Sequence, residues 1–301
     1  MQRINKNVFA QPEIISSNNR IAFQFLRQHH PNYLFSQSLP DKNGNDLFYD
    51  DEGYPWRLFP LIENTVTIDE INSEHEAFEA AKGFGSLTKN LNGIDVSLFK
   101  PALERFHNLT WRYEQFEDAL QKAKPEVIQQ SEKEIAKAKS HKNLVKEYQQ
   151  LIESRKLVLR IMHNDTKVNN ILFDVQSRKA VCVIDLDTLM QGYFIYDLGD
   201  MVRTFVSPVS EEERDISKVQ FRKSIYDALL KGYLSEMEMV LTADEKKSIP
   251  FAGKMMTYIM ALRMLADFLR GNTYYQIAYP GQNLVRARNQ FRLLELIIGS
   301  V

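Results

Sequence analysis

The sequence predicts an α+β protein in two parts, a small N-terminal part that contains strands and a large C-terminal part that is mainly helical. Three observations lead to this: a helical pattern near the start, a strand hairpin after it, and helical periodicity from Ile68 onward that only two short apolar segments interrupt. With 301 residues, 44% of them hydrophobic, the chain can bury one long or two modest cores. The boundary falls near residues 64–69, and we expect domains at 1–66 and 67–301.

The N-terminal part begins with a predicted helix over residues 14–30, in which apolar residues recur at roughly helical spacing. Pro31 ends it, because the residue before a proline avoids the helical region. Residues 47–49 ("LFY") and 56–62 ("WRLFPLI") predict the two strands of a hairpin, joined by a polar turn at residues 50–53. Pro60 cannot donate to a neighbouring strand, so we expect the second strand to lie at an edge or to end there.

The C-terminal part contains two stretches of distinct helical character. Residues 111–156 are strongly charged, with Glu and Lys four residues apart and an apolar stripe too thin for deep burial. This pattern predicts solvated helices, and a helical surface for a partner is the less favoured interpretation. Residues 263–294 predict two helices joined by an aromatic, glycine-containing loop. The sequence shows no repeat at a fixed period and no low-complexity tract.

Composition excludes several classes of function. The formal net charge is -1, so nothing in the overall charge favours nucleic acid or an anionic membrane. A single cysteine, Cys182, excludes an internal disulfide and a multi-cysteine zinc site, and it fits a reducing compartment. The first residues lack the apolar core of a signal peptide, and no stretch approaches the ~20 apolar residues that span a bilayer. We therefore expect a cytoplasmic protein.

The segment "HNDTKVNN" at residues 163–170 carries the strongest chemical signal. One apolar run leads into this polar loop and another leaves it, as in a strand–loop–strand that presents side chains at a site. Phosphoryl transfer to a hydroxyl needs a carboxylate to receive or orient the proton, a divalent metal, and oxygen ligands for that metal. Asp165 suits the first role, while Asn170 and Asp185 suit the metal. The order of histidine, aspartate and asparagine matches the kinase catalytic-loop pattern.

Each of these residues also has an ordinary structural explanation. We interpret His163 as a packed histidine that fixes the loop by bonding to backbone, and not as the proton acceptor. Asp165 could cap the following turn, and Asn170 could be a turn residue. Asp185 and Asp187 follow the apolar strand "AVCVI", where two carboxylates repel each other unless a cation or donors offset them. That favours a metal at Asp185, and it leaves the role of Asp187 open.

Two further motifs are interpreted as structural. In "YDLGDMVR", Asp197 is predicted to cap a helix that begins around Leu198, with Arg203 about a turn further on and within reach of loop carboxylates. The "GFG" at residues 83–85 lies in a helical stretch, where it resembles a local break, so we reject it as a phosphate-binding loop.

The loop between the last two predicted helices combines aromatic rings with arginines, as a sugar pocket does. Packing between the helices is an equally good explanation for the tyrosines. Trp111, Arg112 and Tyr113 have weaker claims. The candidate acceptor-binding residues are Arg263, Asp267, Tyr275, Tyr279 and Arg286.

The segments "HNDTKVNNILFD", "VIDLDT" and "YDLGDMVRTF" resemble the aminoglycoside phosphotransferase and choline kinase superfamily. The wider segments "RINKNVF", "WRLFPLIENTVT" and "YPGQNLVRARNQFRLLE" resemble its N-acetylhexosamine kinase branch, so the resemblance covers nearly the whole chain. It implies a protein-kinase-like bilobal fold and an ATP- and Mg²⁺-dependent transfer of phosphate to a small-molecule hydroxyl, with an N-acetylhexosamine sugar as the acceptor.

The resemblance also assigns roles to residues. Asp165 matches the catalytic aspartate, and Asn170 and Asp185 match the metal ligands. The linker at residues 59–64 matches the segment whose backbone binds adenine, which implicates the nucleotide-binding residues Phe59, Leu61, Ile62 and Glu63.

The chain departs from the family at its start. "MQRINKNVF" looks like the third strand of the small lobe, so we expect a truncated N-terminal lobe without the first two strands and their glycine-rich phosphate loop. Arg3 or Lys6 are then the residues that could approach the phosphates. Loss of that cover would weaken nucleotide binding and let water into the site. The alternative function is therefore a catalytically weakened or inactive kinase-like binding protein.

Overall fold

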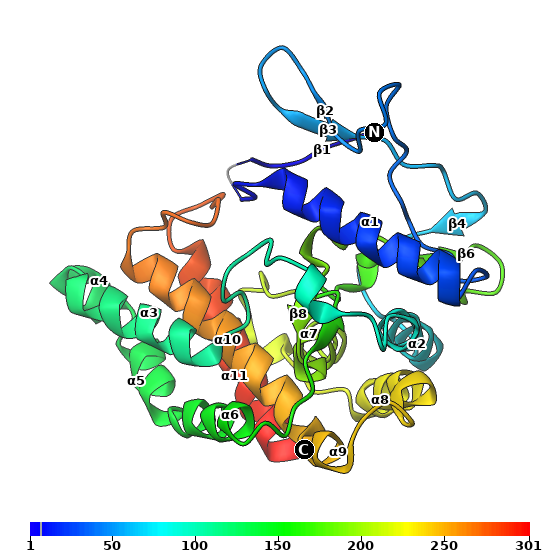
Figure 1. Cartoon of the computed structure of the whole chain (residues 1–301). Coiled ribbons are helices and arrows are strands. Elements are labelled where there is room, and N and C mark those ends of the chain that lie inside the picture. Colours follow the sequence, from blue (N-terminus) through cyan, green and yellow to red (C-terminus); the bar gives the residue numbers. More distant parts are fainter. Residues whose placement is uncertain (7) are drawn as a thin grey trace.

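The computed structural model describes residues 1–6 and 8–301. A small N-terminal lobe lies over a larger, mainly helical body (Figure 1). The small lobe combines α1 (Pro12–His29) with a three-stranded antiparallel sheet in the order β1-β3-β2. Its strands are β1 (Gln2–Arg3), β2 (Phe48–Tyr49) and β3 (Pro55–Arg57).

The predicted N-terminal elements are confirmed with small shifts. The helix runs over Pro12–His29, and the hairpin pairs Phe48 with Trp56. The second strand ends at Arg57, before Pro60, as the missing N–H of proline predicts. It lies at the centre of its sheet, because β1 pairs with its other side.

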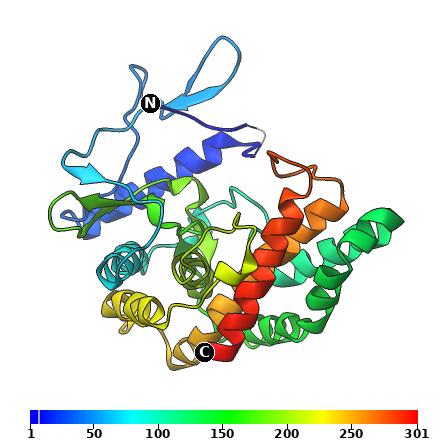
Figure 2. The ribbon, with the colours of Figure 1, turned by 180° about the vertical axis from the view of Figure 1, so that it is seen from behind.

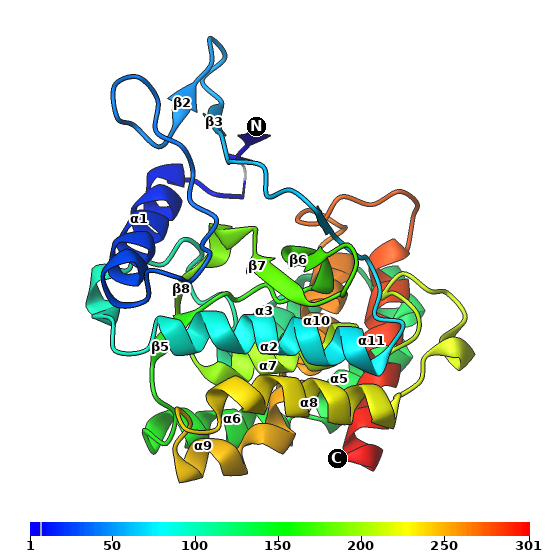
Figure 3. The ribbon, with the colours of Figure 1, turned by 90° about the vertical axis from the view of Figure 1, so that its right-hand side faces the viewer.

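An extended linker joins the two lobes. Residues 58–64 leave β3, and β4 (Thr65–Val66) then pairs with β6 (Ile171–Asp174), a strand of the large lobe (Figure 3). Since β6 also pairs with β7 (Ala180–Val183), this sheet has the order β4-β6-β7. A separate antiparallel pair consists of β5 (Arg160–Met162) and β8 (Met190–Gly192).

The helices of the large lobe surround a long buried helix, α10 (Ile249–Leu269), which packs against α3, α7 and α11. In Figure 2, α11 runs along α10 to the end of the chain. No helix in the described part of the chain is long and apolar enough to cross a membrane. The other helices are α2 (Glu74–Asn90), α3 (Leu109–Lys122), α4 (Pro125–Gln130), α5 (Glu132–Ser140), α6 (Asn143–Glu153), α7 (Phe194–Phe205), α8 (Lys223–Met237), α9 (Ala243–Lys247) and α11 (Gln282–Ser300).

The charged stretch at residues 111–156 is helical, as predicted, and forms α3 to α6. Each of the longer helices buries one narrow face, which Phe116, Ala138 and Tyr148 exemplify, and leaves its charged face in solvent. Short 3₁₀ turns complete the lobe at Val96–Leu98 (η1), Val168–Asn170 (η2), Leu186–Thr188 (η3) and Ile216–Lys218 (η4).

Helices α2 and α8 approach each other unusually closely, side by side in Figure 3. A Cβ atom at Gly232 would lie 2.1 Å from the backbone oxygen of Phe78, so only glycine allows this contact. Gly83 and Gly85 lie inside α2, which runs unbroken through them. The predicted local break is therefore wrong: Gly85 gives room for the backbone of Tyr233 without interrupting the helix.

We expect Gly232→Ala to lower the free energy of unfolding by about 1–3 kcal/mol, because the added methyl forces the two helices apart. Urea unfolding of the purified protein measures this change. Gly299→Ala is the matched control, because that position in α11 has open space around it. Its stability should be unchanged or slightly higher, since alanine favours the helix. Equal stability of wild type and Gly232→Ala would contradict the close contact.

Candidate active site

The predicted loop leaves β5 and returns as β6, at one end of the central strands. Asp165 and Asn170 lie at its two ends and face each other. The Asn170 amide nitrogen donates to the Asp165 backbone oxygen at 2.8 Å and lies 3.5 Å from carboxylate Oδ2. The Ile184 N–H donates to the Asn170 carbonyl at 2.9 Å, which brings the end of β7 against the same loop. The loop and the residues after β7 therefore meet, as the sequence predicts.

His163 is fully buried and holds the loop, which confirms its structural interpretation. Its Nε2 lies 2.9 Å from the Ile184 carbonyl, and Nδ1 accepts the N–H of Asp165 at 3.2 Å. These bonds require a neutral ring with its proton on Nε2. The edge of the Phe84 ring also packs against it, at a centroid distance of 5.3 Å. His163 therefore positions Asp165 through its backbone.

Two buried carboxylates of α7 bind the backbone of the loop. Asp197 accepts the N–H groups of His163 at 3.0 Å and of Asn164 at 2.7 Å. Asp200 accepts the N–H of Thr166 at 2.9 Å. Burial raises the pKa of Asp197 to about 6. Burial acts in the same direction on Asp200, but Arg203 and Lys167 outweigh it and hold the pKa of that carboxyl below its ordinary value.

The predicted helix cap at Asp197 is wrong. α7 begins at Phe194, four residues earlier than expected, because the apolar residues before Asp197 are already helical. The Asp197 carboxylate points at the loop, whose N–H groups it satisfies, and not at the N–H groups of its own helix. Arg203 does reach acidic partners, as predicted, and pairs with Asp200 and Glu211 at 2.8 Å each.

Asn164 has a structural role that the sequence pattern did not indicate. Its backbone adopts the left-handed region (φ 64°), and its side-chain amide donates to the carbonyls of Met162 and Thr188 at 3.0 Å each. Asparagine adopts this conformation more readily than most residues. The sequence feature that could have indicated this role is the position of the asparagine directly before Asp165.

Asp185 and Asp187 leave the end of β7 in different directions. Asp185 is in the left-handed region (φ 57°), and its side chain faces solvent, with no hydrogen-bond donor to its carboxylate among the described residues. The surrounding protein still raises its pKa by burial, and repulsion from Asp187 and Asp165 adds to this. Asp187, by contrast, forms an ion pair with Arg57 of β3.

The donor set fits a divalent cation. Asp185 offers a carboxylate to which no described residue donates, and Asn170, whose amide nitrogen is directed at Asp165, leaves its side-chain oxygen without a donor among the described residues. Hard cations such as Mg²⁺ take such oxygen ligands. Within residues 1–6 and 8–301, no group of three or more His, Cys, Asp or Glu side chains is arranged to hold a metal. A cation held here would take one carboxylate oxygen and one amide oxygen from these two residues.

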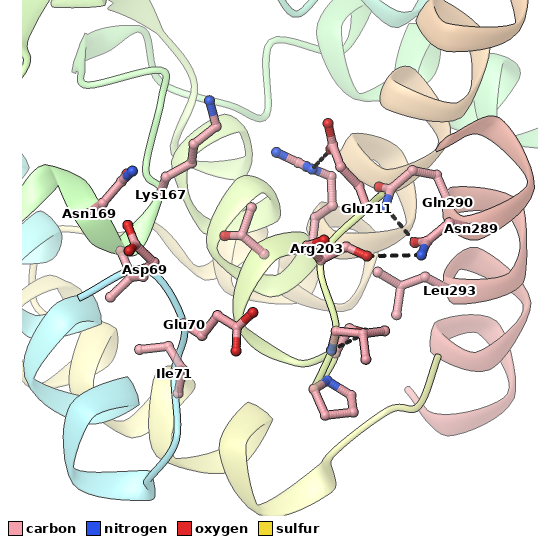
Figure 4. A pocket seen from close by; sticks show the side chains of 16 residues that line it. Asp69, Glu70, Ile71, Lys167, Asn169, Arg203, Glu211, Asn289, Gln290 and Leu293 are labelled. Carbon is pink, nitrogen blue, oxygen red and sulfur yellow. Dashed lines mark hydrogen bonds and ion pairs between the residues drawn. The ribbon is translucent and has the colours of Figure 1, made fainter. Parts of the chain in front are cut away.

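Lys167 is a candidate functional residue that the sequence analysis did not single out. Its ammonium lies 3.2 Å from Asp165 Oδ1, and that carboxylate raises the pKa of Lys167. It lines a cavity of about 270 Å³ between the catalytic loop, the segment after the linker, and α11. Figure 4 shows Lys167 and Asn169 on one side and Arg203 and Gln290 on the other. The signal was a lysine two residues after the predicted catalytic aspartate.

A second cavity of about 320 Å³ lies between α3 and the C-terminal end of α10. The Arg263 guanidinium lies 5.2 Å from the Phe106 ring and 5.6 Å from the Tyr275 ring. Arg112 lines the same cavity, and burial together with Arg263 lowers its pKa to about 9. Trp111 also lines it, so two of the three residues with the weaker claim belong here, while Tyr113 is buried in the core.

The cavity does not use all the candidate acceptor residues in the same way. Asp267 lines it, but its carboxylate accepts the N–H groups of Thr273, Tyr274 and Tyr275 and thereby shapes the loop. Tyr279 and Arg286 lie outside the cavity. The Tyr279 ring packs under Arg214, whose guanidinium carbon lies 4.0 Å from its centroid, and Arg286 pairs with Glu212.

The buried His107 connects this cavity to the catalytic loop. Its neighbour Phe106 lines the cavity, and its own Nε2 donates to the Asn164 carbonyl at 2.8 Å. Burial lowers the pKa of His107 to about 4, so the ring is neutral at pH 7. Asn164 directly precedes Asp165 in the chain. The wall of the cavity is thus one hydrogen bond away from the predicted catalytic residue.

The linker at residues 59–64 has backbone groups available for a ligand. The Ile62 carbonyl accepts the Thr65 hydroxyl at 2.6 Å. No hydrogen bond within the described residues uses the backbone groups of Phe59, Leu61 or Glu63. Arg3 and Lys6, the residues expected near the phosphates, instead pack over the Tyr54 ring at 4.7 and 4.0 Å.

Comparison with known proteins identifies relatives of this fold. Residues 23–230 match the phosphotransferase enzyme family. A microcompartment-associated aminopropanol kinase is similar in structure, with a TM-score of 0.62 and 17% identity over 99% of this chain and 85% of that one. An aminoglycoside phosphotransferase from Alicyclobacillus acidocaldarius gives 0.61 and 11% over 94% and 83%. Amicoumacin kinase, in complex with AMP-PNP and Ca²⁺, gives 0.59 and 16% over 95% and 78%.

We expect Asp197→Ala to lower the free energy of unfolding by about 2–5 kcal/mol, because two buried N–H groups lose their acceptor. Denaturant unfolding followed by circular dichroism measures this. Asp227→Ala is the control, since that exposed carboxylate of α8 pairs only with the exposed Lys223, and it should change stability by less than about 1 kcal/mol. Unfolding of Asp197→Ala at the wild-type midpoint would show that the loop does not depend on this carboxylate.

Proposed function

The chain belongs to the phosphotransferase enzyme family, and on this premise we propose that it is a kinase that transfers the γ-phosphate of ATP, with Mg²⁺, to a hydroxyl of an N-acetylhexosamine. One observation carries the proposal. Asp165, Asn170 and Asp185 converge at the ends of β5, β6 and β7, and none of residues 1–6 and 8–301 donates a hydrogen bond to the Asp185 carboxylate. That is the arrangement phosphoryl transfer to an alcohol requires.

Asp165 is the proposed acceptor of the hydroxyl proton. Its backbone is fixed by His163, while its carboxylate is half-buried and remains open to a ligand. Lys167 pairs with one carboxylate oxygen when no substrate is present. A phosphate group near Asp165 would compete for Lys167 and free that oxygen for the acceptor hydroxyl. The Lys167 ammonium can thus stabilise negative charge on the phosphate group during its transfer.

Asn170 and Asp185 are the proposed ligands of Mg²⁺, which, when bound, offsets negative charge on the phosphates. The protein's own contribution is geometric. The bond from the Ile184 N–H to the Asn170 carbonyl keeps the two ligands at neighbouring ends of the strands. The nucleotide base is proposed to bind backbone groups of the linker at Phe59, Leu61, Ile62 and Glu63, where the Ile62 carbonyl is already used by Thr65.

The cavity lined by Arg112 and Arg263 is the proposed acceptor site. It is lined by the guanidinium groups of Arg112 and Arg263 and by the aromatic residues Phe106, Trp111 and Tyr275. A sugar offers the complement, with hydroxyl and acetamido oxygens for the donors and an apolar ring face for the aromatics. This cavity is connected to the loop of Asp165 through His107, as the first cavity is through Lys167. Its combination of guanidinium groups and aromatic rings favours it as the sugar site.

The proposed reaction predicts ADP release when the protein meets ATP, Mg²⁺ and an N-acetylhexosamine, and less with simple sugars, choline or aminoglycosides. We expect Asp165→Asn to lower kcat by about 10²–10⁴-fold, because the proton acceptor is lost. Asp174→Asn is the control, since that carboxylate binds only its own turn at the end of β6. ADP release that is absent for every acceptor would refute the proposed function and leave a kinase-like binding protein as the alternative.

We expect Arg263→Met to raise the KM for the sugar by about 10–100-fold with a smaller change in kcat, because a charged donor to the acceptor is lost while the aliphatic volume remains. The KM for ATP should stay the same. Arg288→Met is the control, because Arg288 pairs with Glu134 outside the cavity. Steady-state kinetics with each substrate varied separately measure both constants, and an unchanged KM for the sugar would place the acceptor elsewhere.

A further inference from the structure

Arg57 is a buried cation of the small lobe whose side chain reaches the large lobe. It is the last residue of β3, and its side chain is only 2% exposed. Its Nε and Nη2 donate to the Gln2 side-chain oxygen at 3.0 and 2.8 Å, and Nη2 also pairs with Asp187. The Phe59 ring covers the guanidinium at 4.9 Å. These contacts fix its planar fork in one orientation.

The partner of Arg57 belongs to the turn that carries the proposed metal ligand. Asp187 lies in η3, two residues after Asp185, and its side chain is 13% exposed. The ion pair therefore anchors one side of the turn to the sheet of the small lobe. Asp185, on the other side, has no anchoring contact to its carboxylate among the described residues. Its position depends on the turn, which Arg57 holds.

Arg57 also lies directly before the linker. Phe59, two residues further on, is the first residue of the segment proposed to bind the nucleotide base. The strand that continues into the base-binding segment thus carries a side chain that fixes the metal-binding turn. The two ends of an extended nucleotide, base and phosphates, would contact parts of the protein that this one residue connects.

We propose that Arg57 is a positioning residue for the reaction, which through Asp187 fixes the position of Asp185 relative to the linker. The metal ion and the nucleotide base would then bind at the distance from each other that one nucleotide spans. This inference rests on the proposed function in assigning the ion to Asp185 and Asn170. Arg57 itself contacts no reacting atom in this account, because its donors are directed at Gln2 and Asp187.

If Arg57 acted through its charge alone, its removal would change the affinity for Mg²⁺ in the opposite direction. Removal of the Arg57 charge would leave Asp187 without its counter-charge, make the surroundings of Asp185 more negative and strengthen the attraction for Mg²⁺. Loss of positioning would weaken it, since partners that orient metal ligands typically contribute 10–100-fold to metal affinity. The sign of the change therefore separates the two explanations.

The test measures binding of AMP-PNP by titration calorimetry, with Mg²⁺ and with EDTA, and so does not depend on turnover. For the wild type we expect Mg²⁺ to tighten binding. For Arg57→Gln we expect this enhancement to fall by about tenfold or more, while affinity in EDTA is retained through the linker. Arg57→Lys keeps the charge and should retain part of the enhancement, and it remains informative if Arg57→Gln does not fold.

A double-mutant cycle with Asp187→Asn completes the design. If the residues act as one unit, Asp187→Asn resembles Arg57→Gln and the double variant is no worse than either. Arg20→Gln, which breaks the Arg20–Asp46 pair on the surface of the same lobe, is the control and should change nothing. A larger Mg²⁺ enhancement in Arg57→Gln, or a loss in Asp187→Asn alone, would overturn the inference. A wild type that binds no AMP-PNP would instead refute the proposed function.

Discussion

The binding of the loop at residues 163–170 by two buried carboxylates of α7 is the interaction on which the candidate site depends. A polar loop between two strands leaves several backbone N–H groups without a strand partner, and an unpaired buried N–H is costly. Asp197 accepts hydrogen bonds from two of these N–H groups and Asp200 from a third. These three bonds favour one backbone conformation of the loop. Because α7 packs against α10 at the centre of the lobe, the position of Asp165 is set by the core and not by the loop itself.

A second set of contacts joins the two lobes behind this loop. Asn18 of α1 donates its side-chain amide to the carbonyl of Leu189 at 3.0 Å, and Arg57 of β3 pairs with Asp187. Both bonds reach the segment that follows β7 and carries Asp185. The small lobe therefore contacts the turn that carries Asp185 through directional polar bonds in addition to apolar packing. Such bonds fix relative position more sharply than apolar contact, which is not directional.

The sequence predicted the elements well where local patterns decide them. The helix before Pro31, the hairpin that ends before Pro60, and the meeting of Asp165, Asn170 and the strand before Asp185 all follow from periodicity, proline chemistry and strand connectivity. The start of α7 was missed because the apolar residues around Phe194 fit a strand or a helix equally, whereas the polar Asp197 looked like a cap.

What the sequence could not give are contacts between residues distant in the chain. Arg57 and Asp187 are 130 residues apart, and no pattern within either segment connects them. Arg112 and Arg263 share a cavity only because α3 packs along α10. Asp267 had the right composition for sugar binding, but the backbone of its own loop occupies its oxygens. Local chemistry identifies candidates, and tertiary packing decides which of them remain free.

The three carboxylates of the site differ in whether a cationic side chain pairs with them, and this difference supports the proposed binding of a metal ion. Asp187 pairs with the buried Arg57, and Asp165 pairs with Lys167, whose side chain is partly exposed to solvent. Asp185 forms no ion pair within the described residues, although the charges of Asp187 and Asp165 repel its own. A protein rarely leaves a crowded carboxylate without a counter-charge unless a ligand supplies it. The proposed Mg²⁺ would supply this counter-charge, at the end of the strand where Asn170 lies beside the residues that follow β7.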